Sequence, residues 1–524
     1  MKNKNLFLTL CLMAMTVFGF AQVKKIDNLQ VNTTLILPLV TKVQIEALTP
    51  TEGSMVYCTD CSPKSIYIFN GFSFMSLSGS YQLSSVFVFT AFPINNKIYK
   101  RDKALNSSVV PISGRIASSS SISSISLEVF RNNSLLSTTT EVLSNTDNFG
   151  NYTFSFSPTI NAELASYKFV VKSNTGQILK QADNIASGDI YIVTGQSNIV
   201  THSSSVGTFP FTNPYIRTFA SPNNFTSTIT VIRPAALGGI GYWFAEQIVT
   251  NENIPVLVLN GGEGGRPISF FQRNDSDPDN TATNYGQLLT RYKYAGYDPT
   301  DVTSIVWYQG ESDGYQSLSY YTNLFDALYQ DWEEDYNPDS YYVFQVHKGC
   351  GVSITSQIPE AHRGLQNTYS NLTTISTNGA LQGSDNCHYY NTNGYEVLAD
   401  RLYDILDFKY YDATSSAGIY SPNVSNVKFG DASKTTITFQ LVPASDTYTM
   451  GSGMEDDFLI ENSSSTVTSI SLSGNLVTLT LSTAATESNA KLTYLGESQA
   501  TVPYIFNQNN NGMLSFKDVL IGNF

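Results

Sequence analysis

Ser197 lies in the segment Gly195-Gln196-Ser197-Asn198, directly after a run rich in β-branched and aromatic residues, 189–194. That run predicts a short buried strand, and Gly195 allows the chain to turn sharply at its end. A serine at a strand-to-helix turn places its hydroxyl at the carboxyl edge of a sheet, where backbone N–H groups favour negative charge. The residue type and position therefore suit a nucleophile, although a serine here could also only cap a helix.

Asp385 and His388 lie three residues apart in a loop that leads into a predicted helix. At this spacing the carboxylate can accept a hydrogen bond from Nδ1–H of the imidazole while Nε2 faces a pocket. Such a pair fixes the tautomer and stabilises the imidazolium that forms when the base takes a serine proton. A surface turn is the alternative interpretation. Because the pair of Asp385 and His388 comes after a serine turn in the chain, the catalytic interpretation is the better one.

The chain has four histidines, so few other bases are available. His347 ends a predicted strand at the same edge and is the second choice. His362 lies in a helical run, and His202 has no acidic residue close in sequence. No cluster of histidines and carboxylates at ligand spacing indicates a metal site.

Two further groups follow predicted strands. The run Gly261-Gly262-Glu263-Gly264-Gly265-Arg266 would let backbone N–H groups approach a ligand, as an oxyanion hole requires, or it forms a plain tight turn. After the next strand comes Gln309-Gly310-Glu311. The amide of Gln309 can donate to an oxyanion, whereas an ionised Glu311 can only accept.

Strand-like and helical runs alternate in the region that carries these residues. This pattern predicts an α/β class fold, a doubly wound parallel five-stranded sheet of the flavodoxin-like kind, with its crevice at the carboxyl ends of the strands. The predicted strands are 189–194, 255–260, 304–308, 341–346 and 372–377, and the predicted helices are 241–251, 318–332 and 394–408.

The rest of the chain has the alternation of short strands that is typical of all-β domains. Residues 1–21 have the basic start, apolar core and small residues of a signal peptide, which predicts a secreted, periplasmic or cell-surface protein. The expected domains are a small β module at 22–80, an immunoglobulin-like β-sandwich at 81–187, the α/β domain at 188–412 and a second β-sandwich at 413–524.

The composition limits the partners. The 524 residues have a formal charge of −14, 14% charged residues and no basic cluster, which disfavours nucleic acid. Beyond the signal peptide no apolar run is long enough for a membrane helix. Cys58 and Cys61 form an isolated C-x-x-C that favours a local disulfide or a free pair over zinc, and a cross-link between Cys350 and Cys387 is plausible.

Taken together, the segment 188–410 resembles the SGNH hydrolase superfamily, and more closely its sialate O-acetylesterase and carbohydrate-acetylesterase branch. The residues that carry the resemblance are Gly188-Asp189, Gly195 to Asn198, Gly264-Gly265 with Pro267-Ile268, Trp307 to Ser312, and Asp385-x-x-His388 with Gly394. Three departures stand out. The asparagine of the wider superfamily's third block is absent, Tyr389-Tyr390 follow His388 where a proline is common, and Phe270-Phe271 stand where relatives often carry a tryptophan.

The resemblance implies that Ser197 is the nucleophile, His388 the base and Asp385 the residue that orients it, with Glu311 as the alternative acid. It also implies an oxyanion hole made by the backbone N–H groups of Ser197 and Gly265 and the side chain of Gln309. Substrate contacts are expected from Tyr308, Phe270, Arg266 and Tyr389.

These residues imply a serine esterase that removes O-acetyl groups from carbohydrates, either sialic acid or plant or microbial polysaccharide, and that needs no metal or cofactor. The flanking β domains are expected to contact glycan or a cell surface. Two alternatives stay open: an esterase for non-sugar acyl esters, and a glycan-binding or cell-surface interaction protein with an inactive hydrolase core.

Overall fold

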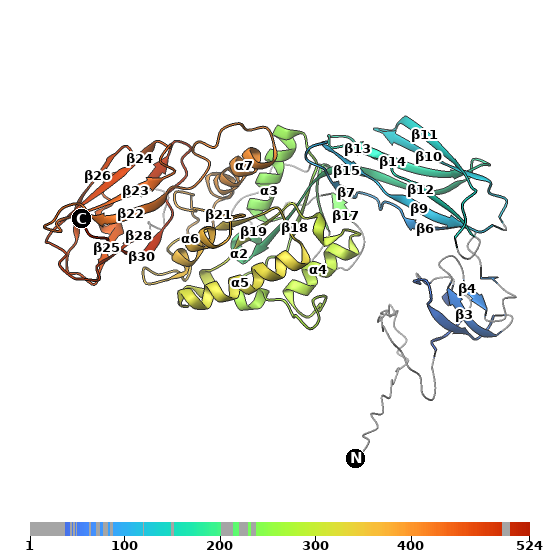
Figure 1. The fold of residues 1–524 in the computed structure, drawn as a ribbon, viewed down its shortest axis with the longest axis horizontal. Helices are drawn as coiled ribbons and strands as arrows, with labels where there is room; N and C mark the ends of the chain where they lie inside the picture. The colour runs from blue at the N-terminus through green and yellow to red at the C-terminus, as the bar shows by residue number, and fades with distance from the viewer. Residues whose placement is uncertain are drawn as a thin grey trace, which may run out of the picture. The chain divides into compact units, whose positions relative to one another are not determined.

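The structure is a computed structural model, and it describes residues 37–524 except positions 42–43, 46–47, 49, 62–63, 70–73, 77–81, 84–86, 119, 148–150, 201–212, 220–228, 232–236 and 495–503. The predicted signal peptide at 1–21 therefore lies outside the described residues. The chain divides into two compact units, Met1–Val86 and Phe87–Phe524. Figure 1 shows the elements of both.

The described part of the first unit is a small five-stranded sheet in which the strands neighbour one another in chain order. The first pair is parallel and the others are antiparallel. Its core holds few side chains, and the disulfide between Cys58 and Cys61 lies within it. The strands are β1 (Leu39–Val40), β2 (Met55–Cys58), β3 (Ser65–Phe69), β4 (Phe74–Ser76) and β5 (Gln82–Leu83).

The second unit begins with a series of β-strands, here called the first β region. One sheet has the order β11-β10-β14-β15 and another the order β12-β9-β6, and buried side chains of both sheets form one core. The strands are β6 (Phe87–Ala91), β7 (Ile98–Lys100), β8 (Ser107–Val109), β9 (Ile112–Ile116), β10 (Ser124–Arg131), β11 (Ser134–Val142), β12 (Tyr152–Phe156), β13 (Thr159–Asn161) and β14 (Tyr167–Ser173).

β15 (Ile178–Gly195) is one 18-residue strand that belongs to two sheets. Its first part pairs antiparallel with β14, and its last part pairs in parallel with β18 and β19. The predicted boundary between residues 187 and 188 lies inside this strand. At its middle the buried Asp189 accepts hydrogen bonds from Nε of Arg101 at 3.0 and 3.1 Å and from the hydroxyl of Tyr411 at 2.7 Å.

The parallel sheet has the order β16-β18-β15-β19-β20-β21, with β17 antiparallel at its edge. All five predicted strands are in it, but the sheet is larger than five because β16 and β17 extend it. These two strands are four and three residues long, too short for a recognisable pattern in the sequence. The strands are β16 (Ile216–Phe219), β17 (Ile229–Val231), β18 (Val256–Asn260), β19 (Ser304–Tyr308), β20 (Ser340–Phe344) and β21 (Leu372–Ile375).

Helices cover both faces of the parallel sheet, with α3 and α7 on one face and α4 and α5 on the other (Figure 1). The predicted helix 318–332 is confirmed as α5, in which Tyr321, Phe325, Leu328 and Trp332 are buried and Ser317 caps the first turn. The helices are α2 (Ser197–Val200), α3 (Gly238–Gln247), η3 (Ile248–Glu252), η4 (Ile268–Phe271), α4 (Asn284–Tyr294), η5 (Pro299–Asp301), η6 (Glu311–Asp313), α5 (Leu318–Asp335), α6 (Ile358–Thr368), η7 (Asn391–Tyr395) and α7 (Glu396–Tyr410).

The C-terminal strands form a four-stranded sheet, a three-stranded sheet and a pair of strands that enclose a separate core. They bind the ends of the parallel strands: Gln345 exchanges hydrogen bonds of 2.8 and 2.9 Å with the backbone of Ser515. The elements are β22 (Asn423–Phe429), β23 (Thr436–Val442), β24 (Tyr448–Met450), η8 (Glu455–Asp457), β25 (Phe458–Glu461), β26 (Val467–Ser473), β27 (Leu476–Leu481), β28 (Lys491–Tyr494), β29 (Ile505–Asn507) and β30 (Phe516–Leu520).

The prediction of a mixed α/β protein is thus confirmed. Among the described residues, no helix has the length and apolar character needed to cross a membrane.

Candidate active site

The serine turn follows β15 and is fixed by its neighbour β19. Gly195 has φ +129°, and a Cβ there would lie 2.1 Å from the carbonyl oxygen of Tyr308, so only glycine fits. The backbone N–H of Gln196 donates to that same carbonyl at 2.8 Å. The side-chain oxygen of Gln196 accepts from the backbone N–H of Ser312 at 3.1 Å. Ser197 comes next, partly buried, as the first residue of α2.

Asp385 and His388 form the hydrogen-bonded pair that their spacing predicted. Nδ1 of His388 lies 2.7 Å from one carboxylate oxygen of Asp385, and the other oxygen accepts from the backbone N–H groups of Cys387 and His388, each at 3.0 Å. Burial raises the pKa of Asp385, but the bonds from His388 and Cys387 outweigh it and lower the pKa overall. The ionised carboxylate therefore holds Nδ1–H, which leaves Nε2 as the basic nitrogen.

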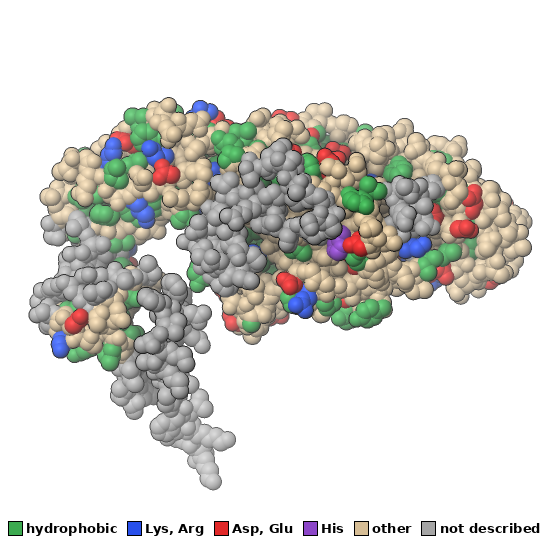
Figure 2. Space-filling model, turned by 180° about the vertical axis from the view of Figure 1, so that it is seen from behind, with side chains coloured by type: hydrophobic (Ala, Val, Ile, Leu, Met, Phe, Trp, Pro, Cys, Tyr) green, Lys and Arg blue, Asp and Glu red, His purple; other side chains and the backbone are tan. Residues whose placement is uncertain are grey.

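The pair lies at the surface of the sheet's carboxyl edge. The side chains of His388 and Asp385 are 29% and 54% exposed. Figure 2 shows histidine and acidic side chains next to each other on one face of the molecule. A base at this position is open to a substrate from solvent.

Asn198 and Glu311 connect the serine turn to the histidine loop. Nδ2 of Asn198 donates to Oε1 of Glu311 at 2.8 Å and to the carbonyl of Cys387 at 3.1 Å. Oδ1 of Asn198 accepts from the hydroxyl of Tyr395 at 2.9 Å. Asn198 thus joins the residue after Ser197 to the residue before His388. The sequence motif contained Asn198, but its type alone did not indicate this role.

Glu311 is buried, and its Oε2 has no hydrogen-bond partner. Burial raises its pKa to about 7, against the opposing effects of the Asn198 bond and of His388 nearby. Between the two acids considered for the base, Asp385 is the one that contacts the imidazole. Glu311 contacts Asn198 instead.

The glycine run after β18 lies beside the serine. The backbone N–H of Glu263 donates to the carbonyl of Gly195 at 2.9 Å. A Cβ on Gly264 would lie 3.9 Å from Cβ of Ser197, and Gly265 has φ +69° with open space around it. The run therefore brings exposed backbone up to the serine, as the predicted oxyanion hole needs.

Gln309 differs from the expectation. It is buried, and its Nε2 donates to Asp313 at 2.7 Å and to the carbonyl of Arg266 at 3.1 Å. Since a side-chain amide has two hydrogens, both are used inside the protein. The predicted donation to an oxyanion is not what this geometry provides. Gln309 instead ties the loop after β18 to the loop after β19.

Two of the four predicted substrate contacts are core residues. Tyr308 and Tyr389 are fully buried, and the hydroxyl of Tyr308 donates to that of Tyr389 at 3.1 Å. Tyr308 also stacks on Phe344. These two tyrosines therefore pack in the core at the carboxyl edge of the sheet and do not face a substrate.

Arg266 and Phe270 remain accessible. The guanidinium of Arg266 is about half exposed, lies 4.6 Å from the ring centre of Phe270 and approaches Glu263 at 4.0 Å. Arg266 thus presents a positive charge two residues from the glycine that borders the serine.

The other described histidines are structural. His347, the second choice for the base, is buried, which lowers its pKa to about 4, and its Nδ1 bonds to the carbonyl of Lys348 at 2.7 Å. His362 is buried as well, with a pKa lowered to about 3 and a 2.8 Å bond to Tyr321. His202 lies outside the described residues.

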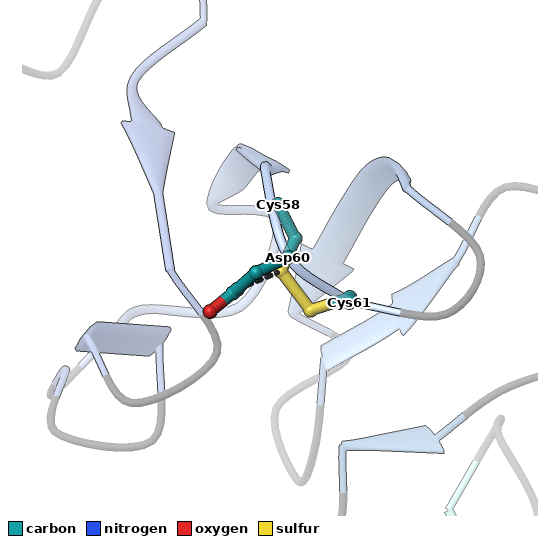
Figure 3. Close-up of side chains that lie close together, drawn as sticks. All are labelled: Cys58, Asp60 and Cys61. Carbon is teal, nitrogen blue, oxygen red and sulfur yellow. Dashed lines mark hydrogen bonds between the residues drawn. A yellow bond between two sulfur atoms is a disulfide. The ribbon is translucent and has the colours of Figure 1, made fainter.

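Both pairs of cysteines considered from the sequence are disulfides. Cys350, in the loop after β20, is bonded to Cys387 beside the base. Cys58 and Cys61 lie with Asp60 in the one group of close potential metal ligands among the described residues (Figure 3). Because the disulfide uses both sulfur atoms, no thiolate remains as a ligand. Oδ1 of Asp60 lies 3.6 Å from Sγ of Cys58, which has no proton to donate in a disulfide.

Comparison with known families finds two matches. Residues 187–406 match the model of a family described as "Carbohydrate esterase, sialic acid-specific acetylesterase". Residues 24–90 match one described as "Phage tail like trimerisation region". The first match confirms the resemblance drawn from the sequence.

A probable carbohydrate esterase from Arabidopsis thaliana is 28% identical over 106 residues, which cover 20% of this chain and 40% of that protein. The structure of a carbohydrate acetylesterase from Xanthomonas citri superposes with a TM-score of 0.58 at 17% identity, covering 82% of this chain and 99% of the other. At that identity the likeness is one of fold.

Proposed function

We propose that the carbohydrate esterase domain at residues 187–406 is a serine esterase that removes O-acetyl groups from carbohydrates, in an exported protein. Ser197 is the nucleophile, His388 the base and Asp385 the residue that orients it. The observation that carries this assignment is the 2.7 Å bond between His388 and Asp385. Asn198, next to Ser197, links the serine turn to this pair by donating a hydrogen bond to the carbonyl of Cys387.

The reaction proceeds in two halves. Oγ of Ser197 attacks the acetyl carbonyl carbon while Nε2 of His388 takes its proton, and the carbonyl oxygen becomes an oxyanion. The intermediate collapses, the sugar alcohol leaves with the proton from His388, and Ser197 carries the acetyl group. Water then attacks the acetyl carbon while Nε2 of His388 takes its proton. The bond between that carbon and Oγ of Ser197 breaks, acetate leaves, and the imidazolium returns the proton to Oγ.

The oxyanion needs preorganised donors, and one such donor contributes about 3 to 4 kcal/mol. The backbone N–H groups of Ser197 and Gly265 are the proposed donors. Gln309 supports them from behind, because its amide holds the carbonyl of Arg266 next to Gly265. Its role is thus to position the glycine loop.

Asp385 is favoured over Glu311 as the orienting acid by contact and by charge. An ionised carboxylate is required to stabilise an imidazolium, and the pKa of Asp385 is lowered whereas burial raises that of Glu311 to about 7. Arg266 ends the glycine run and is half exposed, so its guanidinium is available to a polar group of the substrate.

One experiment tests the assignment. Acetate release by the purified protein and by Ser197→Ala is measured on 4-nitrophenyl acetate, acetylated xylan and O-acetylated sialic acid. We expect release by the wild type and a loss of at least about 10³-fold in the variant. No release from any substrate by the wild type would favour the alternative of a glycan-binding protein. Equal release by both proteins would remove Ser197 from the mechanism.

The alternative of a non-sugar esterase is separated by acyl-chain length. If the site accepts only acetyl groups, activity falls steeply from 4-nitrophenyl acetate to 4-nitrophenyl octanoate. If the site has a wide apolar pocket, activity is higher on the octanoate.

A second proposal concerns assembly: the segment 24–90 holds three copies of the chain together. In the described part of this segment, Leu39 and Met55 are exposed, and the small core suits a module that gains stability by association. Light scattering of the chain without residues 1–21 should give three times the mass of one chain, and Leu39→Glu with Met55→Glu should lower it. A monomeric mass for the parent protein refutes the proposal.

A further inference from the structure

Tyr315 is the most exposed of the large hydrophobic side chains that the structure describes, at 83%. It lies two residues after η6, in the loop that follows β19. Single exposed aromatic residues are common on protein surfaces and need no explanation by themselves. The position and rigidity of this one are what distinguish it.

The backbone on both sides of Tyr315 is fixed. The N–H of Asp313 donates to the carbonyl of Gly310 at 3.0 Å, and that of Gln316 donates to the carbonyl of Asp313 at 2.8 Å. Gly314 packs so tightly that a Cβ there would lie 2.0 Å from the carbonyl oxygen of Gly351. The loop therefore holds the Tyr315 ring in solvent with little backbone entropy left to lose on binding.

Tyr315 is close to the reacting groups. It is four residues from Glu311, so their Cα atoms are at most about 14 Å apart even if the chain were extended. Glu311 bonds to Asn198, the neighbour of Ser197. The loop that carries Tyr315 is thus the same loop that reaches the neighbour of Ser197 through Glu311.

A second exposed tyrosine lies in the loop of the base itself. Tyr390 is 40% exposed and two residues after His388, and its N–H donates to the carbonyl of Leu381 at 3.1 Å. The loops of the two tyrosines are joined indirectly. The Tyr315 loop packs on Gly351, and the adjacent Cys350 is bonded to Cys387. Two exposed tyrosines therefore lie on loops that are linked, through Gly351 and the disulfide, to the loop that carries the base.

We propose that Tyr315 and Tyr390 form a stacking platform for sugar units next to the acetylated one, so that the substrate is an O-acetylated oligo- or polysaccharide. This inference rests on the proposed esterase function. The apolar faces of pyranose rings pack on aromatic rings, and neither tyrosine offers a charge that would select an acidic sugar. A free monosaccharide placed over Ser197 would leave the platform unused.

The test is a length series. Acetate release is measured on acetylated xylose, xylobiose and xylotetraose and on 4-nitrophenyl acetate, for the wild type, Tyr315→Ala and Tyr390→Ala, and the double variant. We expect kcat/KM of the wild type to rise with chain length. The double variant should lose about tenfold on the tetraose, mainly in KM, and nothing on 4-nitrophenyl acetate. Tyr315→Trp should restore most of the loss.

Tyr294 provides the matched control, since it is 52% exposed at the far end of α4. The first residue of α4, Asn284, bonds to the carbonyl of Gly261 beside the site, and the helix then leads about 16 Å away. Tyr294→Ala should leave the series unchanged.

Wild-type activity that does not depend on chain length, or a double variant whose loss is equal on all substrates, overturns the platform. Absence of release from every substrate, 4-nitrophenyl acetate included, instead refutes the esterase function.

Discussion

Replacing Glu311 by glutamine should make the protein more stable at neutral and alkaline pH while leaving its stability at low pH nearly unchanged. Glutamine keeps an oxygen that can accept from Nδ2 of Asn198, the bond of 2.8 Å in the structure. It removes the charge that Glu311 must otherwise carry in a buried position. The NH2 group of the glutamine takes the place of Oε2 of Glu311, which has no hydrogen-bond partner.

The magnitude follows from the pKa. Burial raises the pKa of Glu311 from 4.5 to about 7. A carboxyl whose pKa is raised by folding binds a proton more tightly in the folded state than in the unfolded state. The folded protein therefore loses stability as pH rises from about 4.5 through about 7 and then levels off. The difference between the folded and unfolded pKa values corresponds to at most about 3 kcal/mol of stability at alkaline pH. The gain from the glutamine is smaller than this by the cost of burying its unpaired amide.

The assay is thermal unfolding of the wild type and Glu311→Gln at pH 4.5, 6 and 8. For a domain of roughly 150–250 residues about 3 kcal/mol corresponds to roughly 6–12 °C in Tm, and the shift is smaller for a larger unit that unfolds together. We expect the Tm difference between variant and wild type to grow from pH 4.5 to pH 8, up to this limit. Glu263→Gln, at a half-exposed carboxylate, is the control and should show no such growth. A Tm difference that is the same at all three pH values would refute the reasoning.

Three further outcomes test the site. Asp385→Asn should lower kcat on 4-nitrophenyl acetate by about 10²- to 10⁴-fold, because the amide cannot hold the imidazolium of His388, whereas Glu311→Gln should lower it less than tenfold; the reverse order would make the buried acid the orienting group. Gly195→Ala should cost more than about 3 kcal/mol, since φ is +129° and the new Cβ would meet a carbonyl oxygen at 2.1 Å; soluble expression with unchanged Tm would contradict this. Replacing Cys350 and Cys387 by serine opens a link between residues 37 apart, which should cost about 4 kcal/mol and reduce kcat; an unaltered kcat would show that the base keeps its place without the link.

The sequence predicted the main elements well because their patterns are long. In α5 the apolar stripe recurs at helical spacing over several turns. The residues at 190–194 of β15 are all β-branched or aromatic, and β18 is apolar up to its last residue. The short strands β16 and β17 were missed because four and three residues carry no period.

Side-chain roles were predicted less well, because residue type does not reveal burial. Tyr308 and Tyr389 were expected at the substrate and are in the core, while Tyr315 was passed over and is the exposed ring. Gln309 was expected to face an oxyanion. Its amide instead donates to Asp313, four residues later in the chain. The two side chains meet because of the turn at η6, which the sequence pattern did not predict. In contrast, the bond between Asp385 and His388 was predictable, since both partners lie in one short loop.

β15 has a consequence for how this protein can be divided or recombined. The strand pairs with the first β region through residues 178 to 188 and with the parallel sheet through residues 189 to 195. A cut at residue 187 would sever a continuous strand and leave the buried carboxylate of Asp189 without the guanidinium of Arg101. Loss of one partner from a buried ion pair costs about 3 to 5 kcal/mol. We therefore expect the first β region and the parallel sheet to unfold together, and a graft of the site that begins before β6 to keep the pair of Arg101 and Asp189.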